Sequence, residues 1–329
     1  MNGIPLHPTM HEFLKSLQRE GRSSTSRTYT RGLQNLADWM GAQGIEPNKA
    51  THENLEEFQR YLAEDYRARE GKRERLARVT QGTRLAAVKS YYAWMYRRGV
   101  SLIDPARKIK SPWVRRSKVV RDHLSQQEAT AIIQTQAKFV SVEKEGSKRW
   151  AIEVRNLAML CLAIATGRRC TSLLTLKVEH LDFERNEVRV EWEKGKIGRV
   201  LPCAAWAMDA AKVYTERARA LILCGREDAG LLFVGEHTPC VFKAYLGRLL
   251  RRVQRRTAHE NPDLEGLLEK KLVAHSLRTT FAMMLFLNGA NIRFVNELLL
   301  HERMSTTALY TPLEIDDLRR ALRTSHPRA

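Results

Sequence analysis

The fold of this chain is decided by the stretch Trp150-Ala-Ile-Glu-Val-Arg-Asn-Leu-Ala-Met-Leu-Cys-Leu-Ala-Ile-Ala-Thr-Gly-Arg-Arg169. Its apolar residues recur at helical spacing as far as Ala165, which predicts a core helix. Gly167 breaks that pattern, because glycine is a common helix terminator. The sequence therefore predicts a buried helix that carries Thr166-Gly-Arg-Arg169 at its end.

After Leu176 the period of the apolar residues changes from helical to two. Val188, Val190 and Trp192 alternate with charged residues, a glycine-containing turn follows at 194–198, and the chain returns at 199–202. Alternation with period two is typical of half-buried strands. We therefore expect a hairpin or small antiparallel sheet inside a helical domain.

The elements around this hairpin are expected to be helices. Ser125 and Glu128 form a capping box before residues 129–133. Helical periodicity recurs in residues 204–223, 241–256 and 275–288. Residues 123–329 are thus predicted to form an α+β domain, mainly α with a small antiparallel β-sheet.

Charge is the most informative property of the composition. The 329 residues include 56 Lys and Arg against 37 Asp and Glu, a formal net charge of +19. Such an excess indicates a polyanionic partner, of which nucleic acid is the commonest. A basic membrane-surface protein is the rival class, but no basic amphipathic segment is placed like an anchor. No apolar run of membrane-spanning length and no signal-peptide layout is found.

The five cysteines are an odd number, widely spaced, and contain no CxxC pair. They fit a reducing compartment better than a disulfide framework or a zinc site. We therefore expect the protein in the cytoplasm, at the nucleoid.

The first third of the chain is expected to be an all-α bundle followed by a linker. Four amphipathic runs predict helices at residues 11–20, 24–40, 51–62 (with Thr51 as N-cap) and 80–99. Prolines and many cations at 105–122 indicate an extended basic linker. The predicted organisation is a DNA-binding helical domain at 1–104, a linker at 105–122 and a second domain at 123–329, which together clamp DNA.

The residues expected to contact DNA lie between the third and fourth helices and in the linker. A charge run is often only a solvated loop. This one abuts a helix that begins near Thr80, whose free backbone N–H groups suit phosphate. We predict backbone contacts from Arg67, Arg69, Lys72, Arg73, Arg75, Arg78, Arg84, Lys108, Lys110, Arg115 and Arg116.

Four spaced elements of the second domain carry side chains suited to phosphate chemistry. They are Thr166-Gly-Arg-Arg169, Lys194 in the hairpin turn, His275-Ser-Leu-Arg278, and His301 nine residues before Tyr310. Singly, each has an ordinary explanation, such as a solvated surface charge or a half-buried aromatic. The pattern has meaning only as a set.

As a set, they resemble the tyrosine recombinase (phage integrase) family, as a divergent integrase- or Xer-like member. That family's catalytic domain has a threonine-glycine-x-arginine box, a hairpin lysine, a His-x-x-Arg helix, a later Leu-Gly-His, and a tyrosine nine residues beyond that histidine. All fall here in the family's order over roughly residues 123–318. The helical domain before them looks like the family's core-binding domain.

The resemblance implies a site-specific DNA recombinase that acts through a 3′-phosphotyrosyl bond to Tyr310. Arg169 and Arg278 would bind the phosphate oxygens, Lys194 would protonate the leaving oxygen, and His275 would help to deprotonate the tyrosine. The implied catalytic residues are Arg169, Lys194, His275, Arg278, His301 and Tyr310.

The resemblance also implies partners and cofactors. No metal or cofactor is expected, because the covalent link retains the bond energy. Double-stranded recombination sites and a homotetramer on two DNA sites are expected, and no membrane. The amphipathic tail after Tyr310 would pack on its own domain or dock on a neighbouring subunit.

Several positions depart from the family's pattern. Ser172 stands where an acidic residue is usual, and Thr279, Leu300 and Pro312 replace a histidine, a glycine and a histidine. These departures favour integration, excision or resolution of a mobile element over chromosome-dimer resolution. Lys196 competes with Lys194, which stands five residues before Arg199, the family's spacing from lysine to hairpin arginine.

Two alternatives remain open. A non-enzymatic DNA-binding protein could keep this fold, although the presence of Tyr310 and both arginines argues against it. A type IB topoisomerase shares the chemistry but relaxes DNA without pairing specific sites.

Overall fold

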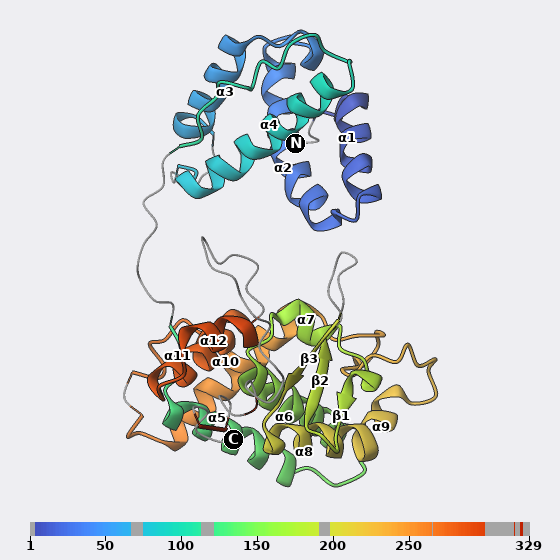
Figure 1. Cartoon of the computed structure of the whole chain (residues 1–329), viewed down its shortest axis with the longest axis vertical. Coiled ribbons are helices and arrows are strands. Elements are labelled where there is room, and N and C mark those ends of the chain that lie inside the picture. Colours follow the sequence, from blue (N-terminus) through green and yellow to red (C-terminus); the bar gives the residue numbers. More distant parts are fainter. Residues whose placement is uncertain are drawn as a thin grey trace. The chain divides into compact units, whose positions relative to one another are not determined.

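The structure is a computed structural model, which describes residues 4–66, 75–112, 122–190, 198–264, 266–299, 319 and 323–324. The chain divides into two compact units, Met1–Lys118 and Val119–Ala329 (Figure 1). The described helices include none that is both long enough and apolar enough to cross a membrane.

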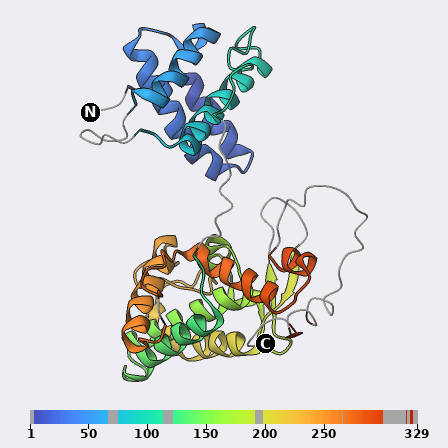
Figure 2. The ribbon, with the colours of Figure 1, turned by 90° about the vertical axis from the view of Figure 1, so that its left-hand side faces the viewer.

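The first unit is a bundle of α-helices, as predicted (Figure 2). Its helices are α1 (Pro8–Arg19), α2 (Ser23–Ala42), α3 (His52–Glu64) and α4 (Arg78–Arg97), with a 3₁₀ turn at Pro47–Lys49. Each helix buries large side chains in a shared core, for example Phe13, Leu36, Phe58 and Tyr91. Burial of such apolar area is the main favourable term in the stability of a small bundle.

The predicted cap of the third helix is confirmed. The Thr51 hydroxyl accepts from the Asn54 backbone N–H (3.3 Å), and the Asn54 side chain accepts from the Thr51 N–H (3.0 Å). The predicted end of the second helix is slightly wrong. α2 continues through Gly41 to Ala42, because a single glycine only weakens a helix that tertiary packing supports.

The first residues of the linker predicted at 105–122 pack on the first unit. Ala106 and Ile109 are buried in the core of the first unit. The Pro105 carbonyl lies 3.0 Å from His52 Nδ1, and the Ile109 and Lys110 carbonyls accept from Lys89 (2.8 Å) and Gln59 (3.0 Å). The apolar side chains between the cations therefore tie residues 105–110 to α3 and α4.

The second unit combines helices with a small sheet, as predicted. Its helices are α5 (Gln126–Ser141), α6 (Lys148–Thr166), α7 (Cys170–Leu174), α8 (Ala205–Val213), α9 (Arg219–Leu223), α10 (Lys243–Glu260), α11 (Ala274–Leu287) and α12 (Ile292–Leu298). The Ser125–Glu128 capping box is confirmed, with Glu128 N donating to Ser125 Oγ (3.2 Å) and Ser125 N to Glu128 Oε2 (2.6 Å).

Helix α6 is the centre of this unit. It packs against α5, α8, α10 and α11, and its last nine residues are all buried. A helix that is apolar on every side is stable only inside a core. The decisive stretch of sequence is therefore a core helix, and its C-terminal end is held by neighbours on several sides.

Three antiparallel strands lie beside these helices (Figure 1). They are β1 (Leu181–Asp182), β2 (Glu187–Val190) and β3 (Arg199–Pro202), in the order β1-β2-β3. Val190 pairs with Arg199 and Val188 with Leu201. Val188 and Val190 are buried while Arg189 is exposed, so the predicted hairpin and its alternation are confirmed.

Three features of this unit were not predicted. The helix expected at 204–223 is interrupted by a π-helical turn at Tyr214–Ala218. The helices α7 and α12, of five and seven residues, are too short to give a periodic signal. Helix α12 begins after Gly289, whose φ is +84°, and is capped by Asn291, whose side chain accepts from Arg293 N (2.9 Å).

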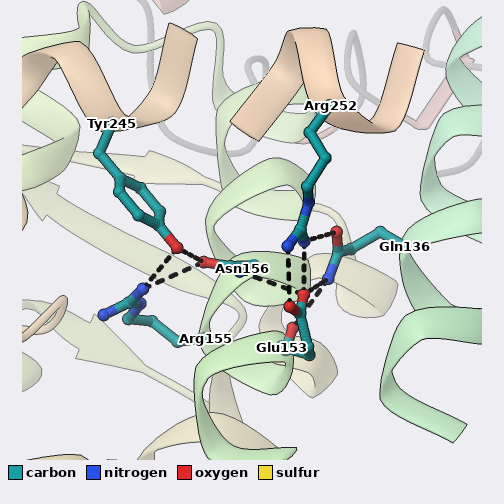
Figure 3. Close-up of polar contacts among 6 residues, drawn as sticks. All are labelled: Gln136, Glu153, Arg155, Asn156, Tyr245 and Arg252. Atoms are coloured by element: carbon teal, nitrogen blue, oxygen red, sulfur yellow. Dashed lines mark hydrogen bonds and ion pairs between the residues drawn. The ribbon is translucent and has the colours of Figure 1, made fainter. Parts of the chain in front are cut away.

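A polar network joins α5, α6 and α10 (Figure 3). Arg252 donates two hydrogen bonds to the Glu153 carboxylate (2.9 and 2.6 Å), which also accepts from Gln136 (2.7 Å) and Asn156 (3.2 Å). Burial raises the pKa of Glu153, but the hydrogen bonds from Arg252 and Gln136 outweigh that effect and hold the pKa below its usual value. The carboxylate is thus the shared acceptor that holds α10 against α5 and α6.

Glu153→Gln is expected to lower the free energy of unfolding at neutral pH by about 1–3 kcal/mol, because Arg252 then loses its charged partner. A lowered folded-state pKa means that this stabilisation is present above pH 4.5 and is lost as the pH falls through the folded value. Urea unfolding between pH 3 and 8 should show the two proteins converging at low pH. Glu227→Gln, at an exposed position, is the control. The prediction is contradicted if the difference in free energy of unfolding between wild type and Glu153→Gln does not change with pH.

Candidate active site

The turn between α6 and α7 presents the first arginine box. Gly167 ends α6 in the left-handed region (φ +56°), and its N–H donates to the Ala163 carbonyl (3.1 Å). A Cβ at this position would lie 2.4 Å from a Phe281 ring carbon and 3.0 Å from Leu299. Only glycine fits, so the turn is held in one conformation that leaves Arg169 exposed at the start of α7.

Gly167→Ala is expected to destabilise the second unit by about 2–4 kcal/mol, because the left-handed backbone strain and the Phe281 clash add. Gly146→Ala is the matched control, since Gly146 also has positive φ but has open space around its Cα. Urea titration should show a cost of only about 1 kcal/mol for the control. Equal effects of the two substitutions would mean that close packing at Gly167 is unimportant.

Arg278 on α11 ties this turn to the end of α12. Its guanidinium is buried (5% exposed) and donates to the Gly167 carbonyl (2.9 Å) and the Leu299 carbonyl (2.7 Å). These two hydrogen bonds use only some of the five N–H donors of the guanidinium group. The donors that remain are available to a ligand, in a position set by three separate parts of the chain.

His275 lies one turn before Arg278, in the first turn of α11, and its side chain is exposed. The i, i+3 spacing places both residues on one face of the helix. The predicted His-x-x-Arg helix is confirmed as a helix.

Three arginines gather at this point. The pKa of Arg278 is lowered to about 10, by burial and then by the charges of Arg169 and Arg168. The pKa of Arg168 is also lowered to about 10, by burial and by Arg169. No carboxylate in the described part of the chain forms an ion pair with any of the three. An excess of positive charge without an internal partner is the signature of a site that binds an anion.

The base of the hairpin is joined to α12. Arg199, the first residue of β3, forms an ion pair with Glu297. Val190 and Arg199 face each other across the hairpin base. The strands that flank the predicted lysine turn therefore lie close to the helix that leads to Leu299.

Several predicted site residues lie outside the described residues. They are Lys194 with its competitor Lys196, His301, Tyr310, and the basic residues Arg67, Arg69, Lys72, Arg73, Arg115 and Arg116. Of the catalytic set, the structure describes Arg169, His275 and Arg278. It brings Arg169 and Arg278 together although 108 residues separate them in the sequence.

The remaining predicted DNA contacts lie in the first unit. Arg75 and Arg78 are exposed at the start of α4, which has neither a side-chain cap nor an acidic first turn. Lys108 and Lys110 are exposed on the segment packed against α3 and α4. Arg84 is half-buried, and burial lowers its pKa.

Two departures from the family's pattern, Ser172 and Thr279, lie among the described residues. Ser172 lies in α7, and no carboxylate among the described residues substitutes for the missing acid beside Arg169. Arg168 is a residue of this site to which the sequence assigned no role. The only sign of it in the sequence is the pair of arginines after Gly167. That pair does not reveal that Arg168, the first of the two, is buried.

Comparisons with known proteins identify the family of the chain. Residues 122–315 match the model of the phage integrase family, and residues 10–99 match the phage integrase N-terminal SAM-like domain. The first match covers more than half of the chain and includes all of the predicted catalytic positions.

The chain belongs to the phage integrase family. Its relatives include a tyrosine recombinase XerC from Pelotomaculum thermopropionicum, 28% identical over 96% of this chain and 97% of the relative. A tyrosine recombinase XerD from Oceanobacillus iheyensis is 30% identical over 76% of this chain and 77% of the relative. The expectation of a tyrosine-type site-specific DNA recombinase is confirmed at the level of the family.

Solved structures share the fold. The XerH recombinase bound to its difH substrate has a TM-score of 0.62 at 16% identity, covering 95% of this chain and 80% of that chain. The Tn1549 transposon integrase in complex with circular intermediate DNA has a TM-score of 0.57 at 15% identity, covering 95% of this chain and 98% of that chain. At such identities the similarity shows the fold alone, and it confirms the predicted fold class.

Proposed function

We propose that this chain recombines specific DNA sites by cleaving and rejoining strands through a covalent bond to Tyr310, in the service of a mobile element. The observation that carries the proposal is the gathering of Arg169 and Arg278, with Arg168, in a place without a carboxylate partner among the described residues. A phosphodiester is the anion that suits planar, permanently charged guanidinium groups.

The proposed reaction is a transesterification. The Tyr310 oxygen attacks the scissile phosphorus, a phosphotyrosyl ester forms at the 3′ side, and the bond to the 5′ oxygen breaks. The tyrosine proton leaves with the help of His275, and Lys194 gives a proton to the 5′ oxygen. Attack by another 5′-hydroxyl reverses these steps and rejoins the strand.

The arginines stabilise charge in this reaction. Arg169 and Arg278 balance the charge on the non-bridging oxygens as the phosphorus becomes five-coordinate, and His301 adds a hydrogen bond. Arg278 is preorganised because its bonds to the Gly167 and Leu299 carbonyls hold it before DNA arrives. Preorganised charge is more effective than charge that must reorient during the reaction.

The first unit serves as the DNA-binding domain. Exposed Arg75 and Arg78 at the uncapped start of α4 oppose the helix dipole, a cost that a bound phosphate would offset. Lys108 and Lys110, exposed on the same unit, would add further phosphate contacts. The domain division proposed is 1–104, 105–122 and 123–329, with residues 105–110 packed on the first domain.

Assembly on DNA completes the proposal. We expect a homotetramer on two duplex sites in the cytoplasm, because exchange between two sites requires four strand cleavages. The described tail residue Arg319 forms an ion pair with Glu187 on β2 of the same chain.

A nicked suicide duplex tests the function. It carries the cognate site, found as inverted repeats in DNA flanking the gene, and its nick lets the cleaved end diffuse away. The wild-type protein should become covalently attached to the 3′ end of one strand. Absence of an adduct on every candidate repeat would refute the function.

Plasmid assays separate recombination from relaxation. The enzyme is expected to recombine a plasmid with two sites and to leave a supercoiled plasmid without sites unchanged. Relaxation of the site-free plasmid without recombination would instead favour a type IB topoisomerase. Binding without any cleavage would favour the non-enzymatic alternative.

A further inference from the structure

Arg168 is a buried arginine whose charge nothing in the described structure satisfies. Its side chain is 8% exposed, and its Nε is buried without a hydrogen-bond partner. It donates to no described residue and pairs with no described carboxylate. Burying a charged group without a partner is costly, so such a residue calls for an explanation.

The other buried arginines of this unit each donate hydrogen bonds to described residues, although the Nε of Arg155 also lacks a partner. Arg155 donates to Val234 O (2.8 Å) and to Tyr245 OH (2.8 Å), and Figure 3 shows the second of these contacts. Arg219 forms two bonds to Asp228 and two to the Leu231 carbonyl. Arg278 bonds two carbonyls. Each of these three guanidinium groups therefore donates hydrogen bonds within the fold. Arg168 differs, because it donates none to the described residues.

Its location suggests what satisfies it. Arg168 lies between Gly167, whose carbonyl holds Arg278, and Arg169. The charges of all three arginines are close enough to disfavour one another. Because no carboxylate among the described residues pairs with this cluster and Ser172 replaces the usual acid, an anion from outside the fold would relieve the repulsion.

We propose that Arg168 is a third arginine of the phosphate site, which binds the DNA backbone at the scissile phosphate together with Arg169 and Arg278. The inference rests on the proposed function, since it names an additional residue of the same site. Arg168 supplies a third fork of N–H donors and a third positive charge. It takes no proton and forms no bond to phosphorus, so it binds and stabilises only.

The test compares wild-type protein with Arg168→Met and Arg168→Lys in the full chain. Methionine has a long apolar side chain that fits a buried position. Arg149→Met is the matched control, because Arg149 is exposed in the first turn of α6, about 25 Å from the other end of that helix. Binding is measured by fluorescence anisotropy as a function of salt, on the duplex that traps the wild-type protein. Thermal unfolding is measured without DNA.

The expected result has two parts. Arg168→Met should bind the duplex about tenfold or more weakly and should reduce the slope of log K against log salt by about 1, as loss of one phosphate contact requires. Its melting temperature should equal or exceed that of wild type, because an apolar side chain replaces a buried unpaired charge. Arg168→Lys should recover part of the binding, and Arg149→Met should resemble wild type in the trapping yield.

A structural role would give the opposite pattern. If Arg168→Met melts several degrees lower while its salt slope is unchanged, Arg168 serves the fold and the inference is wrong. The inference is also wrong if Arg168→Met has the same salt slope, DNA affinity and melting temperature as the wild type. Failure of the wild-type protein to be trapped on any site would instead refute the proposed function, so the two failures are distinguishable.

Discussion

Tyr310→Phe is expected to abolish covalent trapping on the suicide duplex, with a loss of at least about 10³-fold in the cleavage rate. Phenylalanine keeps the ring and removes only the oxygen that would attack phosphorus. A tyrosine hydroxyl has a pKa near 10, so the nucleophile must be activated, and no other group in the proposed reaction can replace it. Trapping is measured by gel electrophoresis after denaturation.

DNA binding should be nearly unchanged in this variant. Affinity comes mainly from cations that contact phosphates, and the substitution alters no charge. Tyr96→Phe is the matched control, because Tyr96 is an exposed tyrosine of α4. It should trap DNA as the wild type does. An adduct on Tyr310→Phe, or an adduct mapped by mass spectrometry to another residue, would remove Tyr310 from the mechanism.

Arg278→Lys is expected to reduce the cleavage rate at least about 100-fold and to lower the free energy of unfolding by about 1–3 kcal/mol. The guanidinium serves the Gly167 and Leu299 carbonyls and has donors left for phosphate. An ammonium group is a point charge without the fork geometry. It cannot hold both carbonyls and a phosphate, so a buried acceptor is left without a donor.

Arg169→Lys provides the contrast. Arg169 is exposed and donates no hydrogen bond to the described residues, so its substitution should slow cleavage without a comparable loss of stability. Single-turnover cleavage and urea unfolding measure the two quantities for both variants. The interpretation fails if Arg278→Lys is as stable as wild type, or if the two lysine variants lose the same stability.

The arginine boxes show how far local sequence can be read. Thr166-Gly-Arg-Arg169 and His275 to Arg278 were found from residue type and spacing, and the structure places both on the predicted elements. Their convergence was inferred from the resemblance to a family. No local pattern could provide it, because the proximity of two residues 109 positions apart depends on how helices pack.

The errors have physical causes as well. Residues 105–110 looked like a linker because prolines and cations dominate them, yet two buried side chains, Ala106 and Ile109, hold them to the bundle. The short α12 escaped detection because seven residues give fewer than two apolar repeats. At residues 105–110 a few tertiary contacts therefore outweighed the local composition.

The sequence by itself determined the charge, the period of each element, and the order of the catalytic boxes, since these depend only on residue type and spacing. It thereby determined the core helix α6 and the glycine that ends it. The tertiary structure alone decided which arginines are buried, which carbonyls they hold, and that Arg168 has no described partner. Burial and hydrogen bonding are properties of neighbours brought from distant parts of the chain, and for that reason only the folded molecule distinguishes Arg168 from Arg169.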